Sequence, residues 1–166
     1  MIIKNLGKNF FINSSLVILI FLIDRISKIY VISLSNKSIE NDIFISKFLN
    51  ITLIWNEGIA FGLFALRDNL YNILTCVIFC IILIIIYILF KSTGFKRYSL
   101  IFILGGALGN LYDRIFYKAV PDFIDFHVGE FHWFIFNIAD VFITVGIIFM
   151  IFIEIMESRN SKIYEK

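Results

Sequence analysis

The chain has 166 residues, of which 60% are hydrophobic, and its mean hydropathy is +0.90. Soluble globular proteins contain about 45–50% apolar residues, so the composition excludes a soluble fold of this size and indicates one integral membrane domain over residues 1–166. The net charge of +2 is too small to indicate nucleic-acid binding, and the sequence has no basic stripe interleaved with aromatic residues.

The first predicted element is a transmembrane helix over about residues 12–34, whose apolar character is interrupted by Asp24 and Lys28. Lys4 and Lys8 precede the apolar stretch, as they do in a cleavable signal peptide. However, the stretch is long and no A-x-A-like cleavage site follows it. We therefore interpret this segment as an uncleaved span.

Residues 35–68 form the next segment, which has the composition of strands. Ile43–Ile45 and Leu49–Trp55 are rich in β-branched and aromatic residues, and the turn formers Asn41 and Asn56 lie nearby. This pattern predicts a small sheet on the membrane surface.

Three further apolar segments follow, at about residues 69–90, 97–116 and 136–156. The first has 22 positions without a charge, and a helix needs about 20 residues to cross the hydrocarbon core. Asp140 is the only charged residue from Phe131 to Ile153. Four transmembrane helices are therefore expected. Cys76 and Cys80, one turn apart in an apolar run, are interpreted as packing residues, and no zinc pattern is present.

The distribution of Lys and Arg predicts the orientation of these helices. One side of the membrane would carry eight basic residues: Lys4, Lys8, Lys91, Lys96, Arg97, Arg159, Lys162 and Lys166. The other side would carry five: Lys37, Lys47, Arg67, Arg114 and Lys118. Both termini are therefore expected in the cytoplasm, and segments 35–68 and 117–135 outside.

Polar residues from separate segments fall at one depth under this topology, near the outer boundary of the membrane. They are Asp24, Lys28, Asn56, Asn110, Asp113, Arg114, Asp122, Asp125, Asn137 and Asp140. Because charged groups in transmembrane segments are costly, their convergence predicts one functional site.

Structural interpretations compete with this one for several residues. Asp24 and Lys28 are four apart and could form only an intrahelical ion pair. Asp113 and Arg114 could mark the helix end, and Asp125 is expected to be a solvated loop acid. His127 and His132 are interpreted as interface residues, not as metal ligands. Asp140 is the hardest to explain structurally, because its own helix has no obvious basic partner within one turn.

The chemistry available to this set is that of paired aspartates, because no serine nucleophile motif is present. Two neighbouring carboxyl groups cannot both ionise easily and share one proton. One can then activate water while the other donates a proton, which hydrolyses an amide without metal or cofactor. Asp122, which follows the stiff residue Pro121, could meet Asp140 if its loop folds back.

Five sequence blocks together resemble the bacterial lipoprotein signal peptidase family, also called signal peptidase II. They are Asp24-Arg-Ile-Ser-Lys28; Asn56-Glu-Gly-Ile-Ala-Phe61-Gly62; Gly105-Gly-Ala-Leu-Gly-Asn110-Leu-Tyr-Asp113-Arg114; Val120-Pro-Asp122-Phe-Ile-Asp125-Phe; and Phe136-Asn137-Ile-Ala139-Asp140. The chain differs from the family pattern at Pro121, where a second aliphatic residue is usual, and at Ile59, where alanine is frequent.

The resemblance implies an all-α membrane protein of four transmembrane helices, with a small extracytoplasmic β-cradle between helices 1 and 2, in the bacterial inner membrane. It implies an aspartic peptidase that cuts prolipoproteins just before a cysteine carrying diacylglycerol. Asp122 and Asp140 match the catalytic pair. Positions that match supporting residues are Asp24, Lys28, Asn56, Gly58, Asn110, Asp113, Arg114, Asn137 and Ala139. The expected partners are the prolipoprotein and membrane lipid, the expected state is a monomer, and Phe61, Leu63 and Phe64 are expected to gate substrate access.

Two other functions fit parts of the sequence. A channel or transporter subunit would need polar groups through the full membrane depth, and the segment 69–90 has only Asn72 and Thr75 near one end. A membrane scaffold that binds partners through its outer segment would tolerate Asn at positions 122 and 140.

Overall fold

The computed structural model describes residues 2–37, 42–58 and 68–164. It contains four long helices: α1 (Ile2–Ser35), α2 (Asp68–Lys91), α3 (Gly94–Phe116) and α4 (Ile138–Tyr164). The expected helices are present, but α1 begins at Ile2 instead of residue 12 and α4 runs past residue 156. Both extensions are formed by residues outside the apolar stretches, which the hydropathy pattern could not include.

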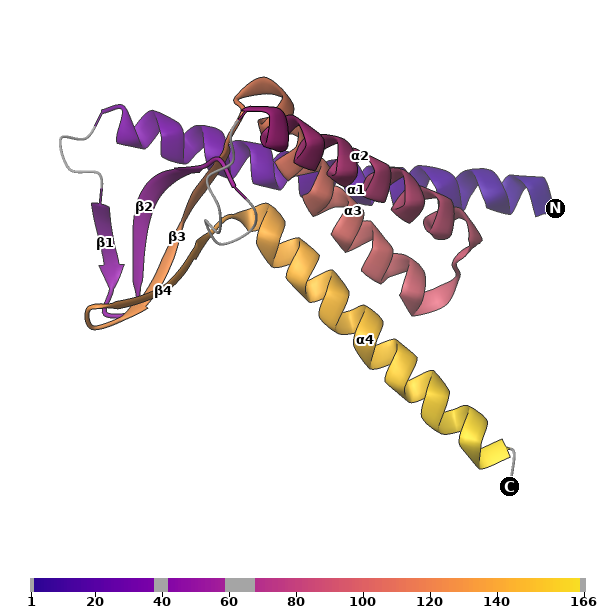
Figure 1. Cartoon of the computed structure of the whole chain (residues 1–166). Coiled ribbons are helices and arrows are strands. Elements are labelled where there is room, and N and C mark those ends of the chain that lie inside the picture. The colour runs from indigo at the N-terminus through magenta and orange to yellow at the C-terminus, as the bar shows by residue number, and fades with distance from the viewer. Residues whose placement is uncertain (1, 38–41, 59–67, 165–166) are drawn as a thin grey trace.

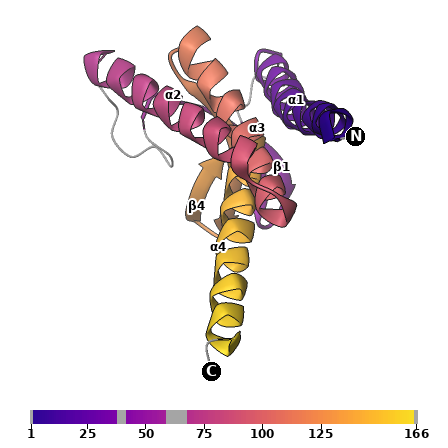
Figure 2. The same ribbon diagram turned by 90° about the vertical axis from the view of Figure 1, so that its right-hand side faces the viewer.

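Helix α3 is the central helix, because α1, α2 and α4 all pack against it (Figure 1). In the end-on view of Figure 2, the other three helices extend from α3 in different directions. The two chain ends lie away from the sheet (Figure 1). At the end of the helices that lies near the sheet, strands from two separate parts of the chain meet the helices.

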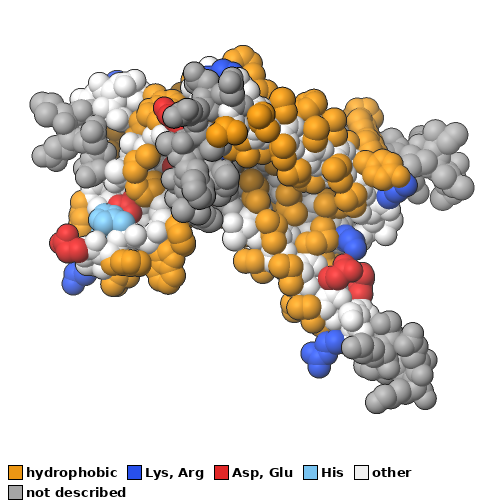
Figure 3. Space-filling model, viewed as in Figure 1, with side chains coloured by type: hydrophobic (Ala, Val, Ile, Leu, Met, Phe, Trp, Pro, Cys, Tyr) orange, Lys and Arg blue, Asp and Glu red, His pale blue; other side chains and the backbone are white. Residues whose placement is uncertain are grey.

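Within the described residues, two helices are long and apolar enough to cross a membrane, Leu70–Lys91 and Ile138–Arg159. Only 6% and 11% of their most apolar windows are buried inside the protein, which differs from the mostly buried core helix of a soluble protein. Hydrophobic side chains cover the visible face of the helices in Figure 3. Such a surface needs an apolar solvent.

The sheet has four antiparallel strands in the order β1-β2-β3-β4. These are β1 (Asp42–Ser46), β2 (Leu49–Asn56), β3 (Val120–Val128) and β4 (Phe131–Phe136). The prediction of a sheet only between the first two helices was therefore incomplete, and "all-α" was wrong as a fold class. The segment 117–135, expected to be a loop, supplies the second hairpin.

The β3–β4 hairpin had a sequence signal that the prediction did not use. Both strands are rich in Val, Ile, Phe and Trp, and Gly129 in the connection has a φ of +60°. A positive φ at a glycine is typical of tight turns. The pairing of β2 with β3 places Asn56 beside Val120 and Ile54 beside Asp122, so strand register carries Asp122 towards the helices.

Glycines let α3 approach its neighbours closely. A Cβ atom on Gly106 would lie 2.4 Å from the backbone oxygen of Ala139 on α4, and one on Gly109 would lie 2.5 Å from a carboxylate oxygen of Asp24 on α1. No real side chain fits at such distances. Because these two positions lack a Cβ atom, α3 can lie directly against Ala139 of α4 and Asp24 of α1.

Candidate active site

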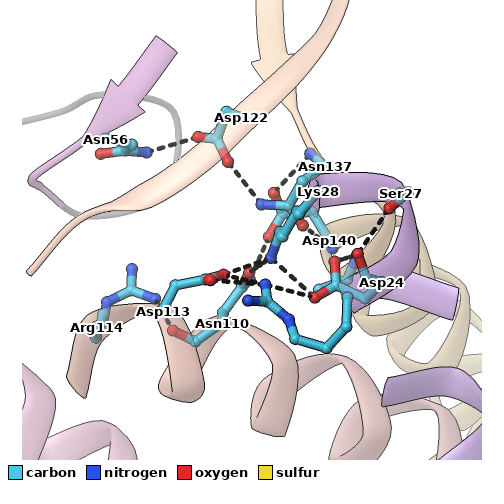
Figure 4. A network of polar contacts seen from close by, with 12 residues as sticks. Asp24, Ser27, Lys28, Asn56, Asn110, Asp113, Arg114, Asp122, Asn137 and Asp140 are labelled. Carbon is cyan, nitrogen blue, oxygen red and sulfur yellow. Dashed lines mark hydrogen bonds and ion pairs between the residues drawn. The ribbon is translucent and has the colours of Figure 1, made fainter. Parts of the chain in front are cut away.

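The polar residues predicted from the sequence, except Asp125, lie together where the sheet meets α1, α3 and α4 (Figure 4). Asp24 and Lys28 come from α1, Asn110 and Asp113 from α3, and Asp140 from α4. Asn56 ends β2, and Asp122 lies near the start of β3. Residues far apart in the chain therefore form one cluster.

Asp140 is held by the first turn of its own helix. Asn137 precedes α4, and its side-chain oxygen accepts a hydrogen bond from the Asp140 N–H at 3.1 Å. In return, the Asp140 carboxylate accepts a bond from the Asn137 N–H at 3.2 Å. This reciprocal pattern is a capping box, which satisfies two helix N–H groups that would otherwise lack partners. Asn110 donates to the other Asp140 oxygen at 2.8 Å.

Asp24 of α1 accepts a further hydrogen bond from the first turn of α4. Its carboxylate accepts a hydrogen bond from the backbone N–H of Ala139 at 3.0 Å and is fully buried. Ala139 is also fully buried, against Gly106 and Gly109 of α3. A larger residue at position 139 would push α4 away from α3. The small Ala139 side chain therefore fixes the position of the neighbouring residue, Asp140.

Asp122 is held by two amides, one on each side. Asn56 donates to one carboxylate oxygen at 2.9 Å, and Asn137 donates to the other at 2.6 Å. Asn137 therefore contacts both aspartates, through its side-chain amide to Asp122 and through its backbone N–H and side-chain oxygen to Asp140. The two carboxylic groups are positioned by one shared residue.

The pKa of Asp122 is raised from 3.8 to about 6. Burial is the main cause, since it disfavours the charged carboxylate, and the negative charge of Asp140 raises the pKa further. Hydrogen bonds from Asn56 and Asn137 act in the opposite direction. A carboxyl group in this state can hold a proton near neutral pH, as a general acid must.

A buried ionic network lies beneath the pair. The Lys28 ammonium is fully buried and lies 3.0 Å from Asp24, 2.7 Å from Asp113 and 2.9 Å from the Asn110 oxygen. The Asp24–Lys28 ion pair, which the sequence offered as a structural alternative, is present but belongs to a network joining α1 to α3. Three fixed partners hold the Lys28 charge beside the aspartates.

Arg25 is the member of the network that the sequence interpretation missed. Its guanidinium contacts Asp113 at 2.6 Å and Asp24 at 3.3 Å, and it packs over the Tyr112 ring at 4.8 Å. The spacing of charges within α1 does not reveal that the partner of Arg25 lies on another helix. Arg114 makes long contacts with the backbone oxygens of Asn110 and Gly58, at 3.4 and 3.5 Å.

A cavity of about 380 Å³ opens beside Asp122. Its described lining residues include Asn56 and Gly58 on one side and Trp133 and Phe134 of β4 on the other. Asp140 is not among them, and it is connected to Asp122 through Asn137. The cavity is mostly apolar, and its lining includes two carboxyl residues, Asp122 and Glu57, which suits an extended peptide segment.

Three residues of the β3–β4 hairpin differ from expectation. Asp125, expected to be solvated, is only 2% exposed. His132 contacts both Asp125 oxygens at 2.8 and 3.0 Å, and the His127 and His132 rings stack with centroids 5.1 Å apart. The interpretation of both histidines as interface residues did not include this contact with a buried carboxylate. Register across two strands, which the spacing alone does not show, brings them together. Phe61, Leu63, Phe64 and Ile59 lie outside the described residues.

The fold and site together define a class: a membrane enzyme in which two aspartates are linked by one asparagine and one of them, Asp122, lines a mostly apolar cavity. The family model for signal peptidase (SPase) II matches residues 16–156. This chain belongs to the signal peptidase II family.

Individual relatives agree with this assignment. The lipoprotein signal peptidase of Pelagibacter ubique (strain HTCC1062) is 47% identical over 160 residues, covering 96% of each chain. That of Anaplasma marginale (strain Florida) is 39% identical and covers 84% of this chain and 82% of its own. A solved bacterial membrane enzyme superposes with a TM-score of 0.74 at 29% identity, over 89% of this chain and 90% of the other.

Proposed function

We propose that this chain removes the signal peptide from diacylglyceryl-modified prolipoproteins and that Asp122 and Asp140 are its catalytic pair. Family membership supports the peptidase activity. The observation that carries the assignment of the pair is the bridge through Asn137, which hydrogen-bonds to both aspartates. A structural ion pair would not need two acids that share a neutral partner.

The reaction follows from one proton shared between two acids. The ionised carboxyl takes a proton from a water molecule as the water oxygen bonds to the scissile carbonyl carbon, and the protonated carboxyl donates to the carbonyl oxygen. A proton then passes to the leaving nitrogen as the C–N bond breaks. The products are the free signal peptide and a lipid-bearing cysteine with a new amino group.

The supporting residues have separate tasks in this proposal. Asn56 and Asn137 orient Asp122, while Asn110 and the capping box orient Asp140. Asp24 and Lys28, with Asp113, hold α1, α3 and the start of α4 in register. Gly58 and Arg114 position the end of β2 at the cavity.

The membrane frame in this proposal consists of four spans with both termini in the cytoplasm. The sheet and the aspartates then lie at the outer boundary of the bacterial inner membrane, where the lipid anchor of the substrate keeps its cysteine. The apolar faces of α2 and α4 would contact bilayer lipid and the diacylglyceryl chains. The proposed state of the enzyme is a monomer.

Cleavage of a defined substrate tests the proposal. The chain purified in detergent should cut a diacylglyceryl-modified prolipoprotein, followed as a mobility shift on a gel, and leave the same precursor with an unmodified cysteine intact. Loss of that discrimination would refute the substrate class, and failure to cut a competent precursor would refute the activity. Cleavage should persist in a chelator, since the proposed chemistry needs no metal.

A further inference from the structure

Asp125, His127 and His132 form a second cluster of chemically active side chains, on the β3–β4 hairpin and separate from the aspartate pair. One ligand atom from each lies within 4.8 Å of the others. The cluster is seated at the sheet end of the molecule, where Figure 3 shows histidine beside an acidic group. The proposed peptidase mechanism uses none of the three residues.

The two imidazoles converge on one carboxylate oxygen. The Nδ1 atom of His132 lies 2.8 Å from Asp125 Oδ2, and the Nδ1 atom of His127 lies 3.9 Å from the same oxygen. Around a tetrahedral Zn²⁺ with bonds of about 2.0–2.1 Å, ligand atoms are roughly 3.4 Å apart. The observed distances lie on both sides of that value, so small side-chain movements would admit an ion.

Two buried polar atoms at this place lack partners among the described residues. His127 is only 8% exposed, and its Nδ1 has no hydrogen-bond partner, because 3.9 Å to Asp125 is too long for one. Asn50 is the β2 residue directly opposite Asp125, and its side-chain oxygen is also buried without a partner. Buried polar atoms are usually satisfied, and a cation among these groups would satisfy both kinds of atom.

We propose that Asp125, His127 and His132 bind a divalent transition-metal ion of the Zn²⁺ class, clamping β3 to β4. Two imidazoles and one carboxylate form a donor set suited to Zn²⁺ and unsuited to Mg²⁺ or Ca²⁺, which take oxygen ligands. Three protein ligands leave a fourth position, for water or the Asn50 oxygen. The His132 side chain is 53% exposed, so an ion can enter from solvent.

The proposed metal site adjoins the wall of the substrate cavity. His132 lines that cavity together with Trp133 and Phe134 of β4. Metal binding would therefore fix the β4 side of the cavity without taking part in hydrolysis. This inference does not depend on the peptidase activity.

Metal titration of the full chain tests the inference. The protein, carrying an affinity tag without histidine, is stripped with a chelator in detergent and titrated with Zn²⁺ by calorimetry. One equivalent should bind and should raise the Tm. His132→Ala and His127→Phe should each weaken binding about tenfold or more, whereas Glu130→Gln, an exposed acid of the same hairpin, should not.

Cobalt provides a second measurement that needs no variant. Co²⁺ bound to the parent should show the intense visible absorption of four-coordinate geometry, and added Zn²⁺ should remove it. Absence of a stoichiometric site in the parent would overturn the inference, and so would equal affinity in the histidine variants. Because His132 is exposed, its replacement leaves the fold intact and keeps the comparison valid.

Discussion

Asn137 determines the geometry of both acids at the scale of single residues. It caps α4, accepts from Asp140 N–H and donates to Asp122. Replacing it would free both carboxyl groups at once, so its removal cannot separate their roles. Asn56 contacts only Asp122 of the two aspartates, and it offers a cleaner way to perturb the pair.

Asn56→Ala should move the alkaline limb of the kcat/KM profile to higher pH. The Asn56 amide stabilises the ionised Asp122, so its loss raises the pKa of that carboxyl further above the parent value of about 6. The shared proton is then retained to higher pH, and activity is lost later as pH rises. The measurement is a pH–rate profile at low substrate concentration.

Asn72→Ala, an exposed change on α2, provides the control and should leave the profile unchanged. A limb that stays in place or moves to lower pH in Asn56→Ala would show that Asp122 does not govern it.

The site residues themselves could be predicted because their types are costly in apolar segments. Asp24, Lys28, Asp113 and Asp140 stand out in any hydropathy reading of the chain. Arg25 could not be assigned, because its partner Asp113 lies 88 positions away. Burial of Asp125 was likewise invisible, since it depends on how β3 pairs with its neighbours.

At the scale of secondary-structure elements, the buried ionic network joins α1 to α3. Arg25 and Lys28 of α1 both contact Asp113 of α3, and all three are at most 7% exposed. Removing one partner of a buried pair leaves an uncompensated charge and costs about 3–5 kcal/mol.

Arg25→Met should therefore lower the Tm of the detergent-solubilised protein markedly. Lys96→Met is the matched control, because Lys96 pairs with Glu154 at 3.0 Å between α3 and α4 but is exposed. Its Tm should stay close to that of the parent, since exposed pairs contribute little. Equal Tm values for the two variants would contradict a stabilising role for the buried network.

Gly106→Ala tests the close approach of α3 and α4. The added Cβ would meet the Ala139 backbone oxygen at 2.4 Å, so the helices must separate, at a cost of about 1–3 kcal/mol. Both Tm and cleavage rate should fall, because Ala139 precedes Asp140. Ala107→Ser, on the neighbouring half-buried position, should change neither. A variant with parent-like Tm and rate would refute the tight contact.

The helices and their approximate positions were predictable, because a long uncharged segment in a bilayer satisfies its backbone hydrogen bonds by forming a helix. The sheet was only half predictable. Strand character was recognised within residues 35–68, but residues 117–135, which contain Asp122, Asp125 and Glu130 among apolar residues, were interpreted as a loop. Asp122 belongs to the site and Asp125 to the hairpin cluster, so functional residues interrupt the apolar strand pattern.

At the scale of the whole molecule, the sheet lies at one end and the helices extend away from it (Figure 1). The proposed topology can be tested with cysteines at the two ends. After Cys76 and Cys80 are replaced by Ala, a cysteine at Glu130 should react with an impermeant maleimide in spheroplasts. A cysteine at Thr93, in the α2–α3 connection, should react only after lysis. The reverse labelling pattern would contradict the assigned orientation.

The most direct test of the central claim is the cleavage rate of Asp122→Asn, Asp140→Asn and the double variant. If the two acids work as one unit, each single change should lower kcat by roughly 100- to 10,000-fold. The double variant should then be no slower than the worse single variant. Substantial cleavage by either single variant, or losses that multiply in the double variant, would contradict a shared catalytic pair.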